Sequence, residues 1–202
     1  MSKIMISPEV FWQVYSAKLN ELECKKFEVN NKSISVYLCD SQWTPHVMGA
    51  AEAACKEFGL QTQNEYYRVD LMGWTQQRDE TDSNALHKWD LNIAYEHENG
   101  KRWDDELCKL CYVAADLKVI SAYHDFAKKE TIIDYLSKCL ENLGKEKIFR
   151  VPDSKWLFVF GPRQVDTEER KEHKFKAFAV DKELNIVPIM TGEKVQPGLW
   201  LI

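Results

Sequence analysis

The segment from Trp89 to Gly100 alternates between apolar and polar side chains, which is the two-residue period of a β-strand. One face of this predicted strand carries Trp89, Leu91, Ile93, Tyr95 and His97. The other face carries Asp90, Asn92, Ala94, Glu96 and Glu98. Glu96 and Glu98 repel each other and lose hydration when they are buried, so a cation or a solvent-exposed site beside them would remove the conflict. This strand is therefore the first place to look for chemistry.

Four helices are predicted from apolar side chains at helical spacing and from start and stop signals. The first begins at Ser7–Pro8, and the second begins at Thr44–Pro45 and ends at Gly59. The third covers about 104–115, where acidic side chains in the first turn suit the helix dipole. The fourth covers about 131–143.

Further strands are predicted at residues 32–40, 66–74, 117–123, 156–160, 175–181 and 186–189. The third helix is followed by a strand with almost no loop, which indicates a strand–helix–strand crossover and hence a parallel pair. We therefore predict an α/β fold, a mixed central β-sheet flanked by helices in a single domain over 1–202. Residues 43–123 would form its core, and residues 124–202 would extend the sheet.

The charge and the cysteines narrow the classes of protein. The net charge of −5 argues against binding of nucleic acid over the whole surface but leaves room for a local basic patch. No apolar run suits a membrane span or a secretion signal, so we expect a cytoplasmic protein with free thiols and no membrane contact. Cys108 and Cys111 have the spacing of half a zinc site, but no second pair completes it, and we expect core thiols.

The segment from Trp43 to Tyr123 places Asp70 on one predicted strand and Glu96 on the next, followed by a helix and a strand. This order resembles the core of the PD-(D/E)XK nuclease superfamily, the restriction-endonuclease-like fold of αβββαβ type. In that family an aspartate on one strand and an acid-x-lysine on the next bind Mg²⁺ beside the scissile phosphate. The resemblance implies that Asp70 and Glu96 hold Mg²⁺ or Mn²⁺, with Glu98 standing where the lysine usually is.

The missing lysine leaves open which side chain stabilises charge at the phosphate. Lys109 is the candidate, since some members of the family carry this lysine on the helix after the acid strand. Glu106 lies three residues before Lys109, so a surface ion pair within the helix is an equally natural interpretation. Glu98 would bind a second ion or act as a base.

Each candidate also has a structural interpretation. An aspartate between two apolar strand residues is disfavoured by strand propensity, but Asp70 could still be structural or face solvent. Glu96 and Glu98 could lie on a solvated edge. His97 lies on the opposite face and is expected to be a hydrogen-bonded core histidine. Glu52, a possible accessory acid, falls off the apolar stripe of its helix and is expected to be exposed.

Lys174 and Lys176 alternate with apolar residues, so both would face one side of a strand and could contact backbone phosphates. Acidic residues are interleaved with the surrounding basic cluster, so a solvated loop is the expected structure of the cluster as a whole. Phosphate-binding glycine loops, nucleophile elbows and H-E-x-x-H motifs are absent from the sequence.

The leading hypothesis is a Mg²⁺-dependent endonuclease-like protein that hydrolyses DNA phosphodiester bonds. Asp70 and Glu96 would hold the metal, Glu98 and Lys109 would assist, and DNA would be the partner. The alternative is a catalytically inactive module of the same fold that binds nucleic acid or protein. An interaction protein with an unrelated α/β fold is a third option. The sequence leaves the oligomeric state open, with a homodimer as one option.

Overall fold

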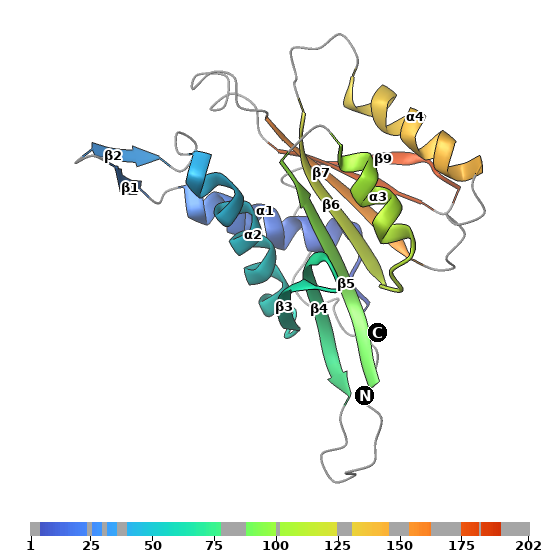
Figure 1. Cartoon of the computed structure of the whole chain (residues 1–202), viewed down its shortest axis with the longest axis horizontal. Helices are drawn as coiled ribbons and strands as arrows, with labels where there is room; N and C mark the ends of the chain where they lie inside the picture. The colour runs from blue at the N-terminus through green and yellow to red at the C-terminus, as the bar shows by residue number, and fades with distance from the viewer. Residues whose placement is uncertain are drawn as a thin grey trace.

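A seven-stranded mixed β-sheet covered by helices on both faces forms the centre of the molecule (Figure 1). The computed structural model describes residues 5–23, 26–29, 32–35, 40–77, 88–99, 102–124, 131–145, 154–162, 175–181 and 183–190. The helices are α1 (Pro8–Glu23), α2 (Asp40–Glu57), α3 (Trp103–Cys111) and α4 (Ile132–Lys145). The strands of the sheet are β3 (Gln61–Tyr66), β4 (Val69–Gln77), β5 (Lys88–Glu98), β6 (Leu117–His124), β7 (Lys155–Pro162), β8 (Lys176–Val180) and β9 (Ile186–Ile189).

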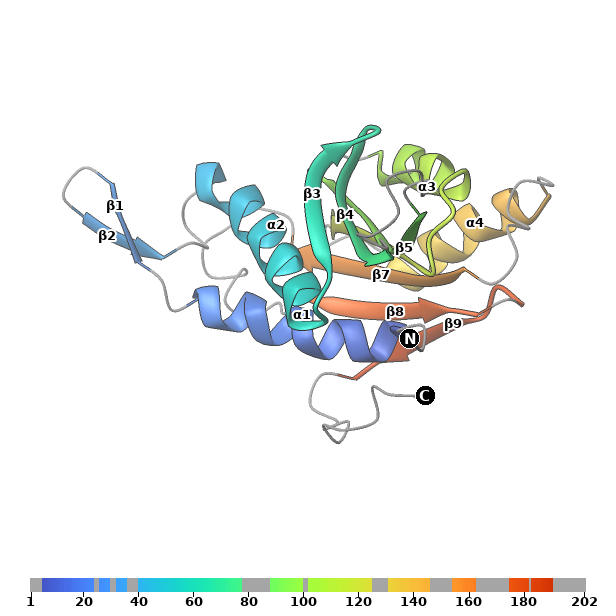
Figure 2. The same ribbon diagram turned by 90° about the horizontal axis from the view of Figure 1, so that it is seen from below.

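The strands follow one another across the sheet in the order of the chain, from β3 to β9. The central strands β5, β6 and β7 are parallel, and the flanking pairs are antiparallel. The helices α3 and α4 connect the parallel strands. Two right-handed crossovers that advance in the same direction place their helices on the same face of a sheet. Figure 2 shows α3 and α4 on one side of the sheet and α1 and α2 on the other.

Both faces of the sheet are therefore buried under helices, in two hydrophobic cores. The first core lies under α1 and α2 and includes Phe11, Tyr15, Val47, Leu71, Ile93, Tyr95 and Val119. The second core lies under α3 and α4 and includes Leu107, Leu110, Leu136, Ala94, Ile120 and Phe158. Burial on both faces explains why β7 is apolar from Trp156 to Phe160 and why β6 is mostly apolar apart from Lys118 and Ser121. Ile93, Ala94 and Tyr95 alternate between the two cores, as the sequence predicts, but Leu91 packs on the second core, opposite to the predicted face, beyond a register shift between Gly73 and Trp74.

The signals at the ends of α1 and α2 are confirmed in part. The Ser7 hydroxyl accepts a hydrogen bond from the backbone N–H of Val10 at 3.3 Å, as an N-cap does. Gly59 follows α2 with a φ of +71°, the left-handed conformation that ends a helix. The predicted start of α2 at Thr44–Pro45 is wrong, because the helix begins at Asp40 and contains Pro45. Pro45 is the sixth residue of α2, beyond the first turn, where proline removes one backbone hydrogen bond and crowds the carbonyl four residues earlier.

The predicted strand over 66–74 is confirmed over 69–74, as part of β4, but not before Val69. The chain makes two strands here, because β3 ends at Tyr66 and a two-residue turn at Tyr67 and Arg68 leads into β4. β3 lies at the edge of the sheet with mostly exposed polar side chains, so it lacks the apolar alternation by which strands are found. Its turn also lacks the usual glycine, asparagine or proline.

A separate two-stranded hairpin, β1 (Lys26–Val29) and β2 (Lys32–Ser35), follows α1 and projects away from the sheet (Figure 1). The predicted strand over 32–40 is thus confirmed only over 32–35, and 36–39 lie outside the described residues. None of the helices in the described ranges is both long enough and apolar enough to cross a membrane.

Candidate active site

Asp70 and Glu96 lie beside each other on neighbouring strands. Leu71 of β4 pairs with Tyr95 of β5 in antiparallel register, so Asp70 stands next to Glu96. Leu71 and Tyr95 enter the first core, and side chains alternate along a strand, so the two acids face the layer of α3. Glu96 is 1% exposed and Asp70 is partly buried. The Asp70 Oδ2 atom accepts a hydrogen bond from the backbone N–H of His97 at 2.7 Å, which anchors it to β5.

Lys109 of α3 reaches this acid pair. Its Nζ atom lies 2.7 Å from Glu96 Oε1, and it also contacts Glu106 of the same helix. The same Nζ donates a hydrogen bond to the backbone carbonyl of Arg68 at 2.8 Å. The ion pair with Glu106 that the sequence suggested is therefore present, together with a pair to Glu96 that it did not suggest. Lys109 joins α3 to β5 and to the turn between β3 and β4.

The charges of this cluster are strongly coupled. Burial raises the pKa of Glu96 to about 9, the nearby charges of Asp70 and Glu106 add to the rise, and Lys109 opposes it. Burial acts to lower the pKa of Lys109, but Glu106 and Glu96 outweigh this effect and raise that pKa on balance. Lys109 is therefore a firmly held cation beside an acid that binds its proton tightly.

The carboxylate of Glu96 retains binding capacity. Its Oε2 atom is buried and makes no hydrogen bond within the described ranges. A buried carboxylate oxygen without a donor is a site that a hard cation would satisfy. Within the part of the chain that the structure describes, no group of three His, Cys, Asp or Glu side chains is close enough to hold a metal ion alone. Asp70 and Glu96 fit Mg²⁺, which usually takes one or two carboxylates and completes its shell with water and phosphate oxygens.

Glu98 lies two residues beyond Glu96 on the same face of β5 and is partly buried, opposite Ala122 of β6. Glu52 lies in the other helix layer, where it pairs with Lys56 at 2.6 Å and accepts a hydrogen bond from Thr62. Glu52 is partly buried rather than exposed, and its pairing with Lys56 accounts for it without a role in the acid cluster.

His97 occupies the opposite face of β5 in a buried polar cluster. Its Nε2 atom lies 3.0 Å from Asn99 Oδ1 and 3.0 Å from the Tyr123 hydroxyl, and its Nδ1 lies 3.4 Å from Ser121 Oγ. Burial lowers the pKa of His97 to about 4, so the ring is neutral at physiological pH. The prediction of a hydrogen-bonded core histidine is confirmed.

The remaining candidates have mixed outcomes. Cys111 is buried, and burial raises its pKa to about 11, but Cys108 is exposed. The prediction of two core thiols is therefore wrong for Cys108, because residues three apart on a short helix diverge enough for one to face solvent. Lys176 is exposed at the start of β8, whereas Lys174 lies outside the described residues.

Two features of this site escaped the sequence analysis. Glu106 was considered only as a surface partner of Lys109, yet it is partly buried and takes part in the acid cluster. The sequence signal that could have revealed this is its position three residues before Lys109, which makes the two side chains neighbours on the helix. The turn at Tyr67 and Arg68 also adjoins the cluster, through the Arg68 carbonyl, and carried no sequence signal.

Comparison of the chain with models of known families, with curated proteins and with solved structures found no match. A functional assignment therefore depends on the geometry of the acid pair and its lysine.

Proposed function

We propose that the chain is a metal-dependent endonuclease-like protein that hydrolyses DNA phosphodiester bonds. The observation that carries this proposal is the meeting of Asp70, Glu96 and Lys109, from two adjacent strands and a crossover helix, at one buried point. Two carboxylates and a lysine are the groups that a nuclease of the PD-(D/E)XK type uses. Here the lysine comes from the helix, as the sequence suggested.

The order of the elements around the site supports the same proposal. The segment α2–β3–β4–β5–α3–β6 runs helix, three strands, helix and strand, which is the αβββαβ order of the restriction-endonuclease-like core. In it, the acids lie on the second and third strands, and the lysine lies on the second helix. β7, β8 and β9 extend the sheet beyond this core.

In this proposal Asp70 and Glu96 bind Mg²⁺ or Mn²⁺, which would polarise the phosphate and lower the pKa of a bound water. Lys109 keeps its positive charge, because Glu106 holds its Nζ, and stabilises the negative charge that develops on the phosphate. Glu98, at the end of β5, accepts the proton from the attacking water. Lys176 contributes contact with the phosphate backbone.

Plasmid cleavage in Mg²⁺ or Mn²⁺ tests the assignment. Asp70→Asn and Glu96→Gln remove a carboxylate while keeping an oxygen and the side-chain volume. Loss of transition-state stabilisation worth several kcal/mol should lower the cleavage rate about 100-fold or more. Glu52→Gln is the matched control, an acid in an ion pair on the other helix layer, and should cleave at the wild-type rate. Equal rates in all four proteins would contradict the proposal.

One observation favours the second candidate, a catalytically inactive module with the same fold. The raised pKa of Glu96 leaves its carboxyl group protonated at neutral pH beside the Lys109 cation, so the site is electrostatically tolerable without a metal. Calorimetric titration with Mn²⁺ separates the two functions. Binding by the wild type that is lost in Glu96→Gln favours the enzyme, and absence of binding by both favours the module.

A further inference from the structure

The turn between β3 and β4 has an unusual backbone for its residues. Tyr67 and Arg68 form a two-residue hairpin turn, closed by the pairing of Tyr66 with Val69, with φ values of +50° and +63°. This left-handed conformation at both central positions normally selects asparagine and glycine, because a side chain beyond Cβ is disfavoured there. A tyrosine and an arginine held in this conformation point to a use of their side chains.

Tyr67 presents its ring to solvent from a fixed position. Its side chain is 80% exposed, the largest exposed fraction among the large hydrophobic residues in the described ranges. The ring of Tyr66 packs edge-to-face against it, with ring centroids 4.5 Å apart, and Tyr66 itself packs on the second core. The Tyr67 ring is therefore oriented by the core rather than left to rotate freely.

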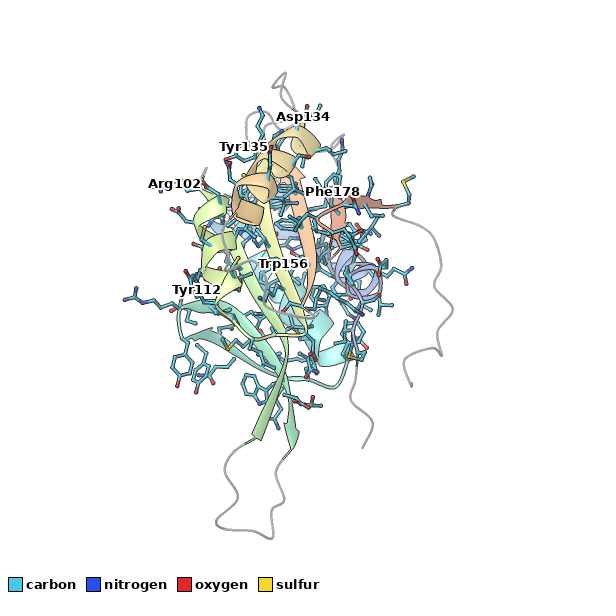
Figure 3. All side chains as sticks on the ribbon, turned by 90° about the vertical axis from the view of Figure 1, so that its right-hand side faces the viewer. Arg102, Tyr112, Asp134, Tyr135, Trp156 and Phe178 are labelled. Carbon is cyan, nitrogen blue, oxygen red and sulfur yellow. The ribbon has the colours of Figure 1, made fainter. Side chains whose placement is uncertain are left out.

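The turn adjoins the proposed active site. The Arg68 carbonyl accepts the hydrogen bond from Lys109 Nζ at 2.8 Å, and Lys109 in turn contacts Glu96. Tyr112 follows α3 directly, and its backbone N–H bonds to the Lys109 carbonyl at 3.1 Å. Figure 3 labels Tyr112 at the end of α3, and its side chain is 71% exposed. Two exposed tyrosines thus flank the lysine of the acid cluster, one on each of the elements that Lys109 joins.

We propose that Tyr67 and Tyr112 are stacking platforms for unpaired bases, so that the substrate is single-stranded DNA or a single-stranded segment of it. This inference rests on the proposed function, whose substrate class it narrows. Bases in an intact duplex are stacked on one another, whereas those of a single strand are free to stack on aromatic rings. Arg68, which is exposed beside Tyr67 in the turn, would offer positive charge to the phosphates.

The surroundings of the two rings favour a nucleic acid over a protein partner. The fully buried centre of a protein interface is enriched in apolar area. The strand beside Tyr67 instead exposes polar side chains, namely Gln61, Gln63, Asn64 and Glu65. Exposed rings on a polar surface, with Arg68 next to Tyr67, suit a strand of alternating bases and phosphates.

Fluorescence anisotropy with labelled oligodeoxythymidine, in EDTA so that no metal-dependent cleavage occurs, tests the inference. We expect the wild type to bind the single strand at least about 10-fold more tightly than the same sequence in a duplex. Tyr67→Ala and Tyr112→Ala should each weaken single-strand binding by about 5- to 100-fold, the loss of one stacked base. Tyr67→Phe and Tyr112→Phe keep the ring and should keep the affinity.

Ile133→Ala is the control, because Ile133 is an exposed hydrophobic residue on α4. It should leave the affinity unchanged, and thermal unfolding of every variant verifies that it is folded. Equal affinity for single strand and duplex, or alanine variants that bind like the wild type, would overturn the inference. If these results accompany plasmid cleavage that requires Asp70 and Glu96, the proposed function stands and only the substrate class is wrong. Single-strand binding that requires the rings, with no cleavage of either single-stranded DNA or plasmid in Mg²⁺ or Mn²⁺, supports the platforms and refutes the enzyme.

Discussion

Lys118 of β6 is buried on the side of the sheet where the acid cluster lies, and its environment is unfavourable to its charge. It is 1% exposed, and its Nζ lies 5.0 Å from the centroid of the Trp156 ring. Burial lowers the pKa of Lys118 from 10.5 to about 8, because the attraction between its ammonium group and the Trp156 ring is weaker than the hydration that the ammonium loses. The folded-state pKa lies below the unfolded value, so protonation favours unfolding. The loss of folding stability caused by Lys118 is complete below about pH 8 and becomes smaller as the pH rises toward 10.5.

We therefore expect Lys118→Met to stabilise the protein. At pH 7 the gain should be about 1–2 kcal/mol after allowance for partial solvation, or about 2–8 °C in Tm. The gain should shrink by pH 10, where the lysine is largely neutral in the folded state. Thermal unfolding at both pH values measures it, with Lys138→Met on the exposed side of α4 as control. A gain of the same size at both pH values would show that packing, and not charge, limits Lys118.

At the scale of single elements, the turn of the β3–β4 hairpin has a strained backbone and carries the exposed ring of Tyr67. Positive φ at a bulky residue costs about 1–3 kcal/mol. Replacing Tyr67 by Asn and Arg68 by Gly installs the residues that this turn prefers. We expect the double variant to raise the free energy of unfolding by about 1–2 kcal/mol, measured by urea denaturation, while it loses the binding of oligodeoxythymidine.

The single variant Arg68→Gly separates the backbone effect from the ring. It should retain most of the stability gain and the Tyr67 ring, and hence the stacking contribution to binding. A double variant less stable than the wild type would mean that the contact between Tyr66 and Tyr67 outweighs the cost of the turn.

At the scale of the whole molecule, the sequence predicted best those segments whose apolar side chains recur at regular spacing and are buried in the structure. β5 alternates between two cores, so the shared face of Glu96 and Glu98 was predictable, as was the parallel pairing with β6. The turn at Tyr67 was not predictable, because its conformation opposes local propensity and is held by tertiary contacts. The reach of Lys109 to both Glu96 and Glu106 was only partly predictable, since a long flexible side chain can choose between local and distant partners.

The order of strands in the sheet has a consequence for how the protein acquires its activity. Every strand from β3 to β9 pairs with its immediate successor in the chain, so the sheet can be assembled in the order in which its strands are made. Folding during synthesis proceeds from the N-terminus. The acid pair, its lysine and the two exposed tyrosines all lie between Tyr67 and Tyr112, ahead of β7, β8 and β9. The ribosome therefore releases the complete set of site residues before the strands that close the far side of the sheet have been made.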